Sequence, residues 1–301
     1  MLDCTSEGGE REAGAPVPPL TVGAALARAA GRLARAGVEE ASLEAQLLLA
    51  HASGLERARL LAHPELPLER VAADGFRDLI ARRTRGVPLA YLTGWREFYG
   101  RPFQVSPAAL IPRPESELLV DLALEELRRF AAETRPRLLD LGTGSGALAI
   151  SIALAAPHTR VFASDLSAAA LGVATANARR LGARVWLFQG DLLQPLRAPL
   201  DLLVANLPYL SPADLAAAPP EVRAHEPSLA LVGGARGTEL IERLLPRLAT
   251  ALRPGGAALL EIGWLQAAAL RRRARAALPG ADVQVLRDYA GLDRVLRVRR
   301  G

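Results

Sequence analysis

Four consecutive residues, Asn206-Leu207-Pro208-Tyr209, combine side chains suited to holding a planar nitrogen group. They follow the apolar run 201–205, which is typical of a buried strand. The tip of a strand is where α/β enzymes place their chemistry. A carboxamide both accepts and donates hydrogen bonds, and a tyrosine ring can stack on a flat group. The four residues therefore predict a site for an amide or exocyclic amine nitrogen, although an Asn-containing turn and a core tyrosine would be the simpler reading of either residue alone.

A glycine-rich loop, Gly142-Thr143-Gly144-Ser145-Gly146, follows an expected strand and opens an expected helix. Glycines there permit a sharp turn and a close approach of a ligand to main-chain atoms. The spacing differs from the dinucleotide fingerprint G-x-G-x-x-G, and the loop lacks the Gly-Lys-Ser/Thr ending of a P-loop. This spacing disfavours a dinucleotide oxidoreductase. Taken alone, the glycines would also fit an ordinary strand-to-helix turn.

Acidic residues end the next two expected strands. Asp165 is placed to accept both hydroxyls of a ribose, although it could instead cap the next helix. Asp191 could reach an adenine edge while its neighbour Leu192 packs against the ring. No arginine adjoins Asp165 to pair with a phosphate. The predicted ligand is therefore a nucleoside without a pyrophosphate, and S-adenosylmethionine is the natural candidate.

The elements that would position these residues alternate between strand and helix from residue 137 onward. Strands are expected at 137–141, 160–164, 185–189, 200–205 and 257–262, with a strand pair near 283–286 and 295–298. Helices are expected at 147–155, 168–181, 238–252 and 265–277. Such alternation predicts an α/β fold with a mostly parallel sheet and helices on both faces.

The first part of the chain has a different character. Residues 1–19 are rich in Gly, Glu and Pro and are predicted to be disordered. Residues 20–87 have the apolar spacing of a small helical domain. Aromatic residues and glycines gather at 88–114, which predicts a β-hairpin linker. The candidate site would belong to a further domain at 115–301.

Composition narrows the class of protein. The chain has 301 residues and a net charge of +5, with arginine as its only strongly basic residue. This charge is spread along the chain, so no stable binding of nucleic acid is expected. A single cysteine and four scattered histidines predict no disulfide framework and no metal site. No apolar run reaches membrane-spanning length and no secretory signal is evident, so we expect a cytoplasmic protein. We also expect it to be a monomer.

The motifs together resemble the class I S-adenosylmethionine-dependent methyltransferases that modify amide or exocyclic amine nitrogen. More narrowly, the chain resembles the release factor glutamine methyltransferases over about residues 20 to 300, including the helical domain before the hairpin. Further segments that resemble this family's motifs, in the same order, are 91–98, 110–115, 226–231 and 287–289.

The resemblance implies a Rossmann-like class I methyltransferase domain with a mostly parallel seven-stranded sheet, preceded by a small helical bundle and a β-hairpin. It also implies the substrate, which is the glutamine of the Gly-Gly-Gln motif in class I peptide chain release factors. Methylation of the N5 amide nitrogen of that glutamine would modulate translation termination.

Carried over by position, residues 142–146, Asp165, Leu192 and Asn206 contact S-adenosylmethionine, and residues 206–209 hold the glutamine. In the family logic Asn206 Oδ1 and the carbonyl oxygen of residue 207 accept the two amide N–H groups, and Tyr209 packs against the amide plane. The family usually has Asn-Pro-Pro-Tyr, whereas position 207 here is Leu. Leu keeps the carbonyl group but lacks the fixed φ of proline.

Other interpretations stay open at this stage. A nitrogen methyltransferase acting on a ribosomal-protein glutamine, or on adenine N6 in nucleic acid, would share the same strand tip. A noncatalytic nucleotide-binding module would not need that tip. Arg113 and Glu226 either form an ion pair that braces the site or are two unrelated surface charges.

Overall fold

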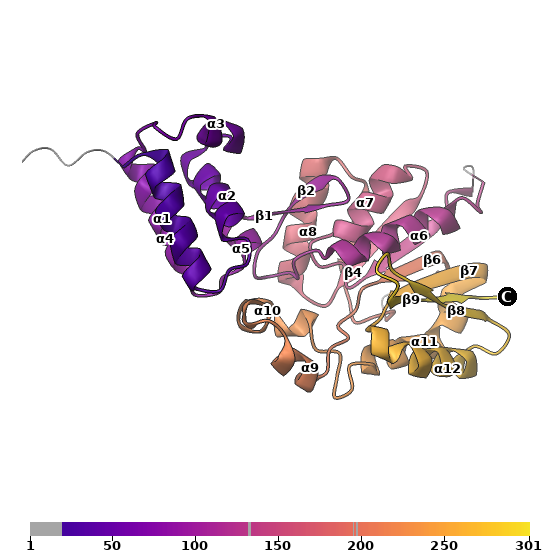
Figure 1. Ribbon diagram of the computed structural model, residues 1–301. Helices are drawn as coiled ribbons and strands as arrows, with labels where there is room; N and C mark the ends of the chain where they lie inside the picture. Colours follow the sequence, from indigo (N-terminus) through magenta and orange to yellow (C-terminus); the bar gives the residue numbers. More distant parts are fainter. Residues whose placement is uncertain (1–19, 132–133, 195, 197) are drawn as a thin grey trace, which may run out of the picture. The chain divides into compact units, whose positions relative to one another are not determined.

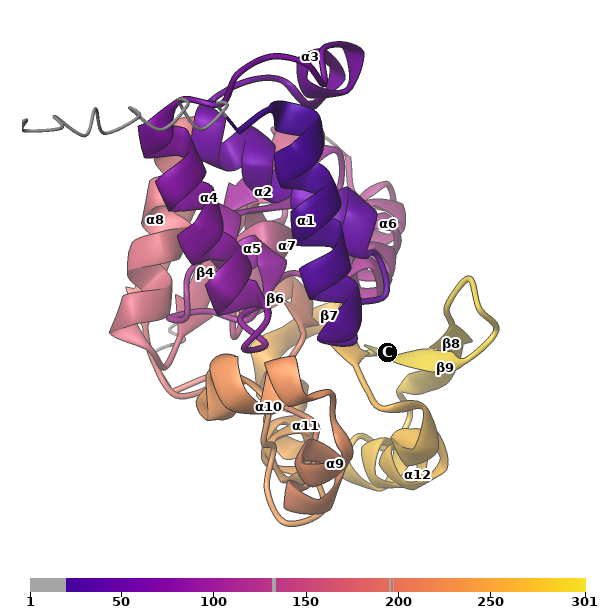
Figure 2. The ribbon, with the colours of Figure 1, turned by 60° about the vertical axis from the view of Figure 1, so that its left-hand side comes forward.

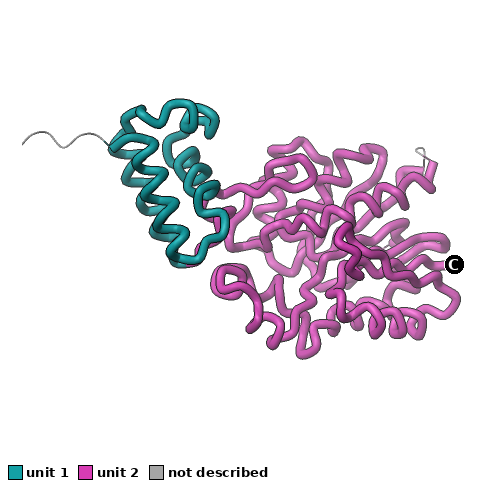
Figure 3. Tube along the Cα trace, in the orientation of Figure 1, with its two compact units in different colours: residues 1–85 teal, residues 86–301 magenta. Residues whose placement is uncertain are grey.

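The computed structural model describes residues 20–131, 134–194, 196 and 198–301. The chain divides into two compact units, residues 1–85 and residues 86–301 (Figure 3). The disorder predicted for residues 1–19 lies outside the described residues.

The described part of the first unit is helical. Its helices are α1 (Val22–Arg35), α2 (Ala41–Ser53), α3 (Arg57–Ala62) and α4 (Arg70–Arg83). Thr21 caps α1, because its hydroxyl accepts the N–H of Ala24 at 3.3 Å. Arg83 Nε of α4 lies 2.5 Å from Glu44 Oε2 of α2, and both side chains are largely buried. The ion pair and the buried apolar faces of α1, α2 and α4 hold the bundle together.

The second unit begins with the short helix α5 (Leu89–Thr93) and a hairpin of β1 (Trp95–Phe98) and β2 (Arg101–Gln104). The turn residues Tyr99 and Gly100 have φ values of 51° and 69°, the left-handed conformation that type I′ hairpin turns require. Asn177 of the sheet domain accepts the N–H of Gln104 at 2.8 Å and donates to its carbonyl oxygen at 2.9 Å. The hairpin therefore packs as part of the sheet domain.

A seven-stranded sheet forms the centre of the second unit, with the order β5-β4-β3-β6-β7-β9-β8. Its strands are β3 (Arg137–Leu141), β4 (Arg160–Asp165), β5 (Val185–Gln189), β6 (Leu200–Ala205), β7 (Leu252–Glu261), β8 (Asp282–Arg287) and β9 (Asp293–Arg299). β3 to β7 pair in parallel, and β9 runs antiparallel to both of its neighbours. The mostly parallel sheet expected from the sequence is confirmed.

Helices cover both faces of this sheet (Figures 1 and 2). One face packs against α6 (Glu117–Leu127), α7 (Ala147–Ala155) and α8 (Ala168–Leu181). The other packs against α11 (Glu239–Ala251) and α12 (Ala267–Ala277). Successive strand residues alternate between the two cores; in β6, Leu202 and Val204 join the first and Leu203 and Ala205 the second. Both faces are apolar because both are covered.

Shorter segments connect these elements. They are the 3₁₀ turns η1 (Pro114–Ser116), η3 (Ser228–Ala230) and η4 (Trp264–Gln266), and the helices α9 (Pro212–Ala217) and α10 (Pro220–His225). Within the described part of the chain, no helix is long and apolar enough to span a membrane.

The strand order reverses at β3, whose neighbours are β4 on one side and β6 on the other. The chain proceeds outward from β3 to β5 and then returns to continue from β6. In open α/β sheets, the crevice at the carboxyl ends of the strands at such a reversal is the usual ligand site. The fold therefore points to the loops after β3, β4 and β6.

Candidate functional site

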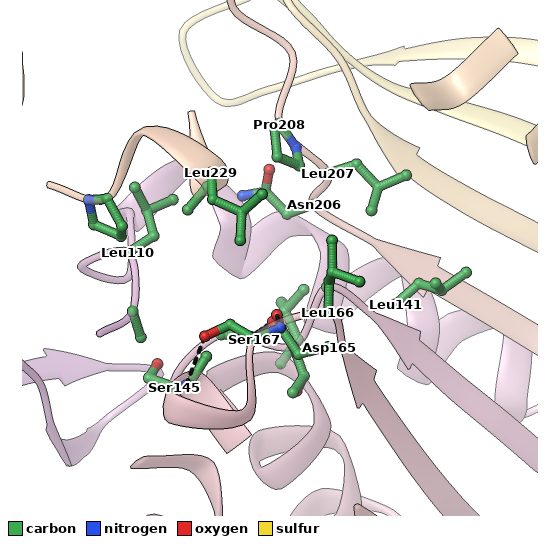
Figure 4. Close-up of a pocket in the computed structure, with 18 of the residues that line it drawn as sticks. Leu110, Leu141, Ser145, Asp165, Leu166, Ser167, Asn206, Leu207, Pro208 and Leu229 are labelled. Carbon is green, nitrogen blue, oxygen red and sulfur yellow. Dashed lines mark hydrogen bonds between the residues drawn. The ribbon is translucent and has the colours of Figure 1, made fainter. Parts of the chain in front are cut away.

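A pocket of about 400 Å³ lies at this reversal point. Its volume falls within the roughly 300–1,000 Å³ of small-molecule sites. The loops after β3, β4, β5 and β6 all line it, and the described lining residues come from distant parts of the sequence, from Phe98 to Arg243. Figure 4 shows Asn206, Leu207 and Pro208 facing Asp165 and Ser167 across the pocket. Among the residues predicted from sequence, only Gly146 and Tyr209 are absent from the lining.

The glycine loop owes its shape to left-handed backbone conformations. Gly142, Gly144 and Gly146 have φ values of 72°, 56° and 83°. A Cβ on Gly146 would lie 2.8 Å from Ile150 Cδ1 and 3.2 Å from Ala174 Cβ, which is too close for normal packing. Gly146 therefore serves the close packing of α7 against α8, and its expected contact with the cofactor stays a prediction.

A buried aspartate, Asp140, stabilises the glycine loop through hydrogen bonds. Asp140 Oδ2 accepts the Thr143 hydroxyl at 2.6 Å and the N–H of Ala149 at 3.2 Å. Burial raises the pKa of Asp140 to about 7, against the opposing effect of these two hydrogen bonds. The carboxyl group ties the loop to the first turn of α7.

Asp165 ends β4 and lines the pocket. Its Oδ2 accepts the N–H of Gly144 at 2.9 Å, and its Oδ1 accepts the N–H of Ser167 at 2.8 Å. Ser167, not Asp165, is the N-cap of α8. Each carboxylate oxygen can accept more than one hydrogen bond, so Asp165 can shape the loop and still bind hydroxyl groups.

Both arginines in the lining are paired with carboxylates. Arg243 Nη2 of α11 lies 2.8 Å from Asp191 Oδ2, and Arg113 Nη2 lies 2.5 Å from Glu226 Oε1. Arg113 and Glu226 therefore form an ion pair and are not two unrelated surface charges, since the Glu226 side chain is almost fully buried. Each of these arginines therefore has a carboxylate that balances its charge.

The strand tip carries a hydrogen-bond chain that the sequence analysis missed. Asn206 Nδ2 donates to Ser116 Oγ at 2.9 Å, and Ser116 Oγ donates to Glu261 Oε2 at 2.6 Å. Ser116 and Glu261 are 4% and 2% exposed. Burial raises the pKa of Glu261 to about 7, with the Ser116 hydrogen bond opposing it. The sequence did offer a signal for Glu261, because an acidic residue follows the apolar run 257–260. That run lies in β7, the strand that pairs with β6.

Tyr209 contacts Glu261, the last residue of this series of hydrogen bonds. Its hydroxyl donates to Glu261 Oε1 at 3.5 Å, and burial together with Glu261 raises its pKa to about 12. The ring does not line the pocket described above. Its predicted contact with an amide plane therefore stays a prediction.

The main chain after Asn206 is held firmly without a proline at position 207. The N–H of Leu210 donates to the carbonyl oxygen of Leu231 at 3.0 Å, and the N–H of Gly233 donates to the carbonyl oxygen of Leu210 at 3.0 Å. Gln266 Nε2 donates to the carbonyl oxygen of Tyr209 at 2.8 Å. Leu207 itself is buried, so its side chain anchors the segment in the core.

The pocket residues fit S-adenosylmethionine. Main-chain groups of the glycine loop, a carboxylate at the second strand tip and the buried Leu192 match the parts of a nucleoside. Among the described residues, no group of three or more His, Cys, Asp or Glu side chains could hold a metal ion.

Comparison with known proteins agrees with this architecture. The catalytic domain of hMettl16, solved in complex with the MAT2A 3′UTR hairpin 6, superposes with a TM-score of 0.54 at 16% identity, covering 73% of this chain and 81% of that one. A methyltransferase from Pyrococcus furiosus superposes with a TM-score of 0.50 at 19% identity, covering 75% of this chain and 98% of that one. The fold is that of the class I methyltransferases.

Sequence relatives narrow this class. A family model described as the PrmC N-terminal domain matches residues 24–94, and one described as the methyltransferase small domain matches residues 116–218. The release factor glutamine methyltransferase of Moorella thermoacetica is 50% identical over 91% of this chain and 97% of its own length. That of Bordetella pertussis is 46% identical over 84% and 93%. The chain belongs to the release factor glutamine methyltransferase family.

Proposed function

We propose that the protein transfers a methyl group from S-adenosylmethionine to the N5 amide nitrogen of the Gly-Gly-Gln glutamine in class I peptide chain release factors. Family membership supports the choice of substrate. The observation that carries the proposal is the orientation of Asn206, whose Nδ2 is bound by Ser116 at the edge of the nucleoside pocket. The opposite end of that carboxamide is the acceptor that an amide N–H requires.

The chemical difficulty lies in the substrate nitrogen, because the lone pair of an amide nitrogen is delocalised into its carbonyl group. When bound, S-adenosylmethionine would supply an electrophilic methyl group; the transfer breaks the S–CH₃ bond, leaves S-adenosylhomocysteine and releases one proton from the nitrogen. The protein's part is to hold the nitrogen in line with that methyl group. Asn206 Oδ1 and the Leu207 carbonyl oxygen accept the two N–H groups of the glutamine, which fixes the direction of the nitrogen.

The cofactor is held by the opposite side of the pocket. Asp165 accepts the ribose hydroxyls, the glycine loop allows close approach to main-chain atoms, and Leu192 packs against the adenine ring. The Asp191–Arg243 pair lies at the adenine end. We further propose that the enzyme acts as a monomer in the cytoplasm and does not bind nucleic acid stably.

The test is incubation with S-adenosylmethionine carrying a labelled methyl group and a set of acceptors. These are a release factor, the same factor with the Gly-Gly-Gln glutamine replaced by alanine, DNA, and ribosomes. We expect label on the intact release factor and none on the substituted one. Label on DNA or ribosomes alone would contradict the proposal and favour the adenine or ribosomal-protein alternative.

A further inference from the structure

We propose that Ser116 and Glu261 are positioning residues that lock the Asn206 carboxamide in the one orientation able to accept a hydrogen bond from the substrate. This inference rests on the proposed function, because it assigns the two residues a role in the same methyl transfer. Neither residue lies in the Asn-Leu-Pro-Tyr segment or the glycine loop.

The three side chains come together from distant parts of the sequence. Ser116 ends η1, Glu261 ends β7, and Asn206 directly follows β6, the strand that pairs with β7. The Ser116 hydroxyl stands between the other two, 2.9 Å from Asn206 Nδ2 and 2.6 Å from Glu261 Oε2. Because Ser116 and Glu261 are buried, water does not compete readily for these bonds.

The direction of each hydrogen bond follows from the chemistry of the groups. An ionised carboxylate only accepts, so the single hydrogen of the Ser116 hydroxyl is directed at Glu261. The Ser116 oxygen then accepts, and only the Nδ2 end of Asn206 can donate to it. The Oδ1 end is thereby turned away from Ser116. An inverted carboxamide would present two oxygens to each other at Ser116 and an NH₂ group to the substrate NH₂ group.

The surroundings of Glu261 decide when it is ionised. Burial raises its pKa to about 7; the Ser116 hydrogen bond, the positive charge of Arg294 from β9 and the Tyr209 hydroxyl act in the opposite direction, while Glu115 raises it further. Arg294 is itself paired with Asp288, with its Nε 3.0 Å from Asp288 Oδ2. The carboxyl group therefore changes its charge near neutral pH.

Protonation of Glu261 would remove the preference for the productive orientation of the Asn206 carboxamide. A Glu261 that is protonated on Oε2, the oxygen facing Ser116, donates to the Ser116 oxygen, and the Ser116 hydrogen must then find another acceptor. Asn206 supplies one only if its carboxamide inverts and presents Oδ1. The productive orientation is therefore stabilised above the pKa of Glu261 and lost as the pH falls below it.

The first test compares three serine variants in single-turnover methylation of a release factor. Ser116→Ala removes the acceptor for Nδ2, and we expect the single-turnover rate constant to fall about tenfold, since a buried donor left unpaired disfavours the productive orientation. KM and the calorimetric Kd for S-adenosylmethionine should stay within about twofold. Ser116→Thr keeps the hydroxyl group and should restore most of the rate.

Ser151→Ala is the matched control, because Ser151 is also fully buried and its hydroxyl has no hydrogen-bond partner among the described residues. We expect this variant to keep the wild-type rate. If Ser116→Ala also keeps the wild-type rate while the wild type methylates the release factor, the positioning role is wrong and the proposed function stands. If the wild type does not methylate the release factor, the proposed function itself fails.

The second test is the pH profile of the single-turnover rate between about pH 6 and 8. The wild-type rate should fall as the pH is lowered through about 7, the pKa of Glu261. Glu261→Gln cannot titrate and should show a flat profile. His225→Gln, which removes the histidine beside Glu226, should retain the wild-type slope. A slope that persists in Glu261→Gln, or is absent from the wild type, would overturn the proposal.

Discussion

The two ends of a carboxamide are nearly equal in size, but only one of them accepts hydrogen bonds. The value of Asn206 to an incoming amide therefore depends on which end it presents. The bond from Asn206 Nδ2 to Ser116 settles this in the structure, because it commits the donating end to the protein. The sequence shows that residue 206 is an asparagine, but the direction of its acceptor oxygen depends on Ser116, which lies 90 positions away.

Replacing Asn206 with alanine should separate chemistry from cofactor binding. We expect Asn206→Ala to lose methyl transfer by about a hundredfold or more, because the acceptor that directs the nitrogen is removed. The Kd for S-adenosylmethionine, measured by calorimetry, should change by no more than a few fold. Undiminished methylation of a release factor by this variant would exclude Asn206 from the acceptor role.

Asp165 should show the opposite pattern. Asp165→Ala removes the predicted ribose acceptor and the acceptor of the Gly144 N–H, so affinity for S-adenosylmethionine should fall at least about tenfold. Asp165→Asn is the matched control, since it keeps one acceptor oxygen and should lose less. An unchanged calorimetric Kd in Asp165→Ala would remove this residue from the cofactor site.

Some residues of the site could be predicted from the sequence and others could not. Asp165, Asp191 and Asn206 were predicted because each lies at or just after the end of a strand that its apolar pattern reveals. Ser116 and Glu261 were not, because their meaning depends on a contact between segments 145 residues apart. The hydrogen bond of the Tyr209 hydroxyl to Glu261 likewise joins segments that are 52 positions apart.

At the scale of elements, the segment after β6 is shaped by close approaches of backbone to backbone. A Cβ on Gly233 would lie 2.1 Å from the carbonyl oxygen of Pro208, and a Cβ on Gly237 would lie 2.2 Å from that of Tyr209. Both glycines therefore allow the loop before α11 to press against the Asn206–Tyr209 segment. This packing, together with Gln266, replaces the stiffness that a proline at position 207 would supply.

Gly233→Ala should accordingly displace the strand tip. We expect methyl transfer to fall at least about tenfold and stability to fall by about 1–3 kcal/mol, because the backbone near Pro208 must move. Gly172→Ala is the control, since Gly172 lies in the exposed face of α8 with nothing within 4 Å of an added Cβ. It should keep full activity and gain about 0.5–1 kcal/mol of helix stability. Thermal unfolding and methylation assays on both variants provide the comparison.

Most elements of the sheet domain were predictable from the sequence. The expected bounds of β3, α7, α8, β5 and β6 agree with the structure, because their apolar runs are long enough to recognise and glycines mark several of their ends. The helices α9 and α10 were not expected. Each has six residues, too few to show a helical period, and each begins at a proline that also suits a turn.

In the molecule as a whole, the described residues that line the pocket all belong to the second unit. The described residues of the first unit, 20–85, have their own buried core, and none of them is part of that lining. We therefore propose that the helical domain, predicted at residues 20–87, serves to engage the release factor. Its boundary with the hairpin segment at 88–114 and the methyltransferase domain at 115–301 stays a prediction from sequence.

Removing residues 1–85 tests this division of labour. Because all described lining residues of the pocket lie within residues 86–301, the truncated chain should bind S-adenosylmethionine with a Kd within about threefold of the full chain. Methylation of a release factor should show a KM raised at least about tenfold, since the docking contacts would be lost. Calorimetric binding of the cofactor doubles as the control that the shortened chain has folded. Retention of the full-length KM by a chain that still binds the cofactor would refute the docking role and place recognition of the release factor wholly in the second unit.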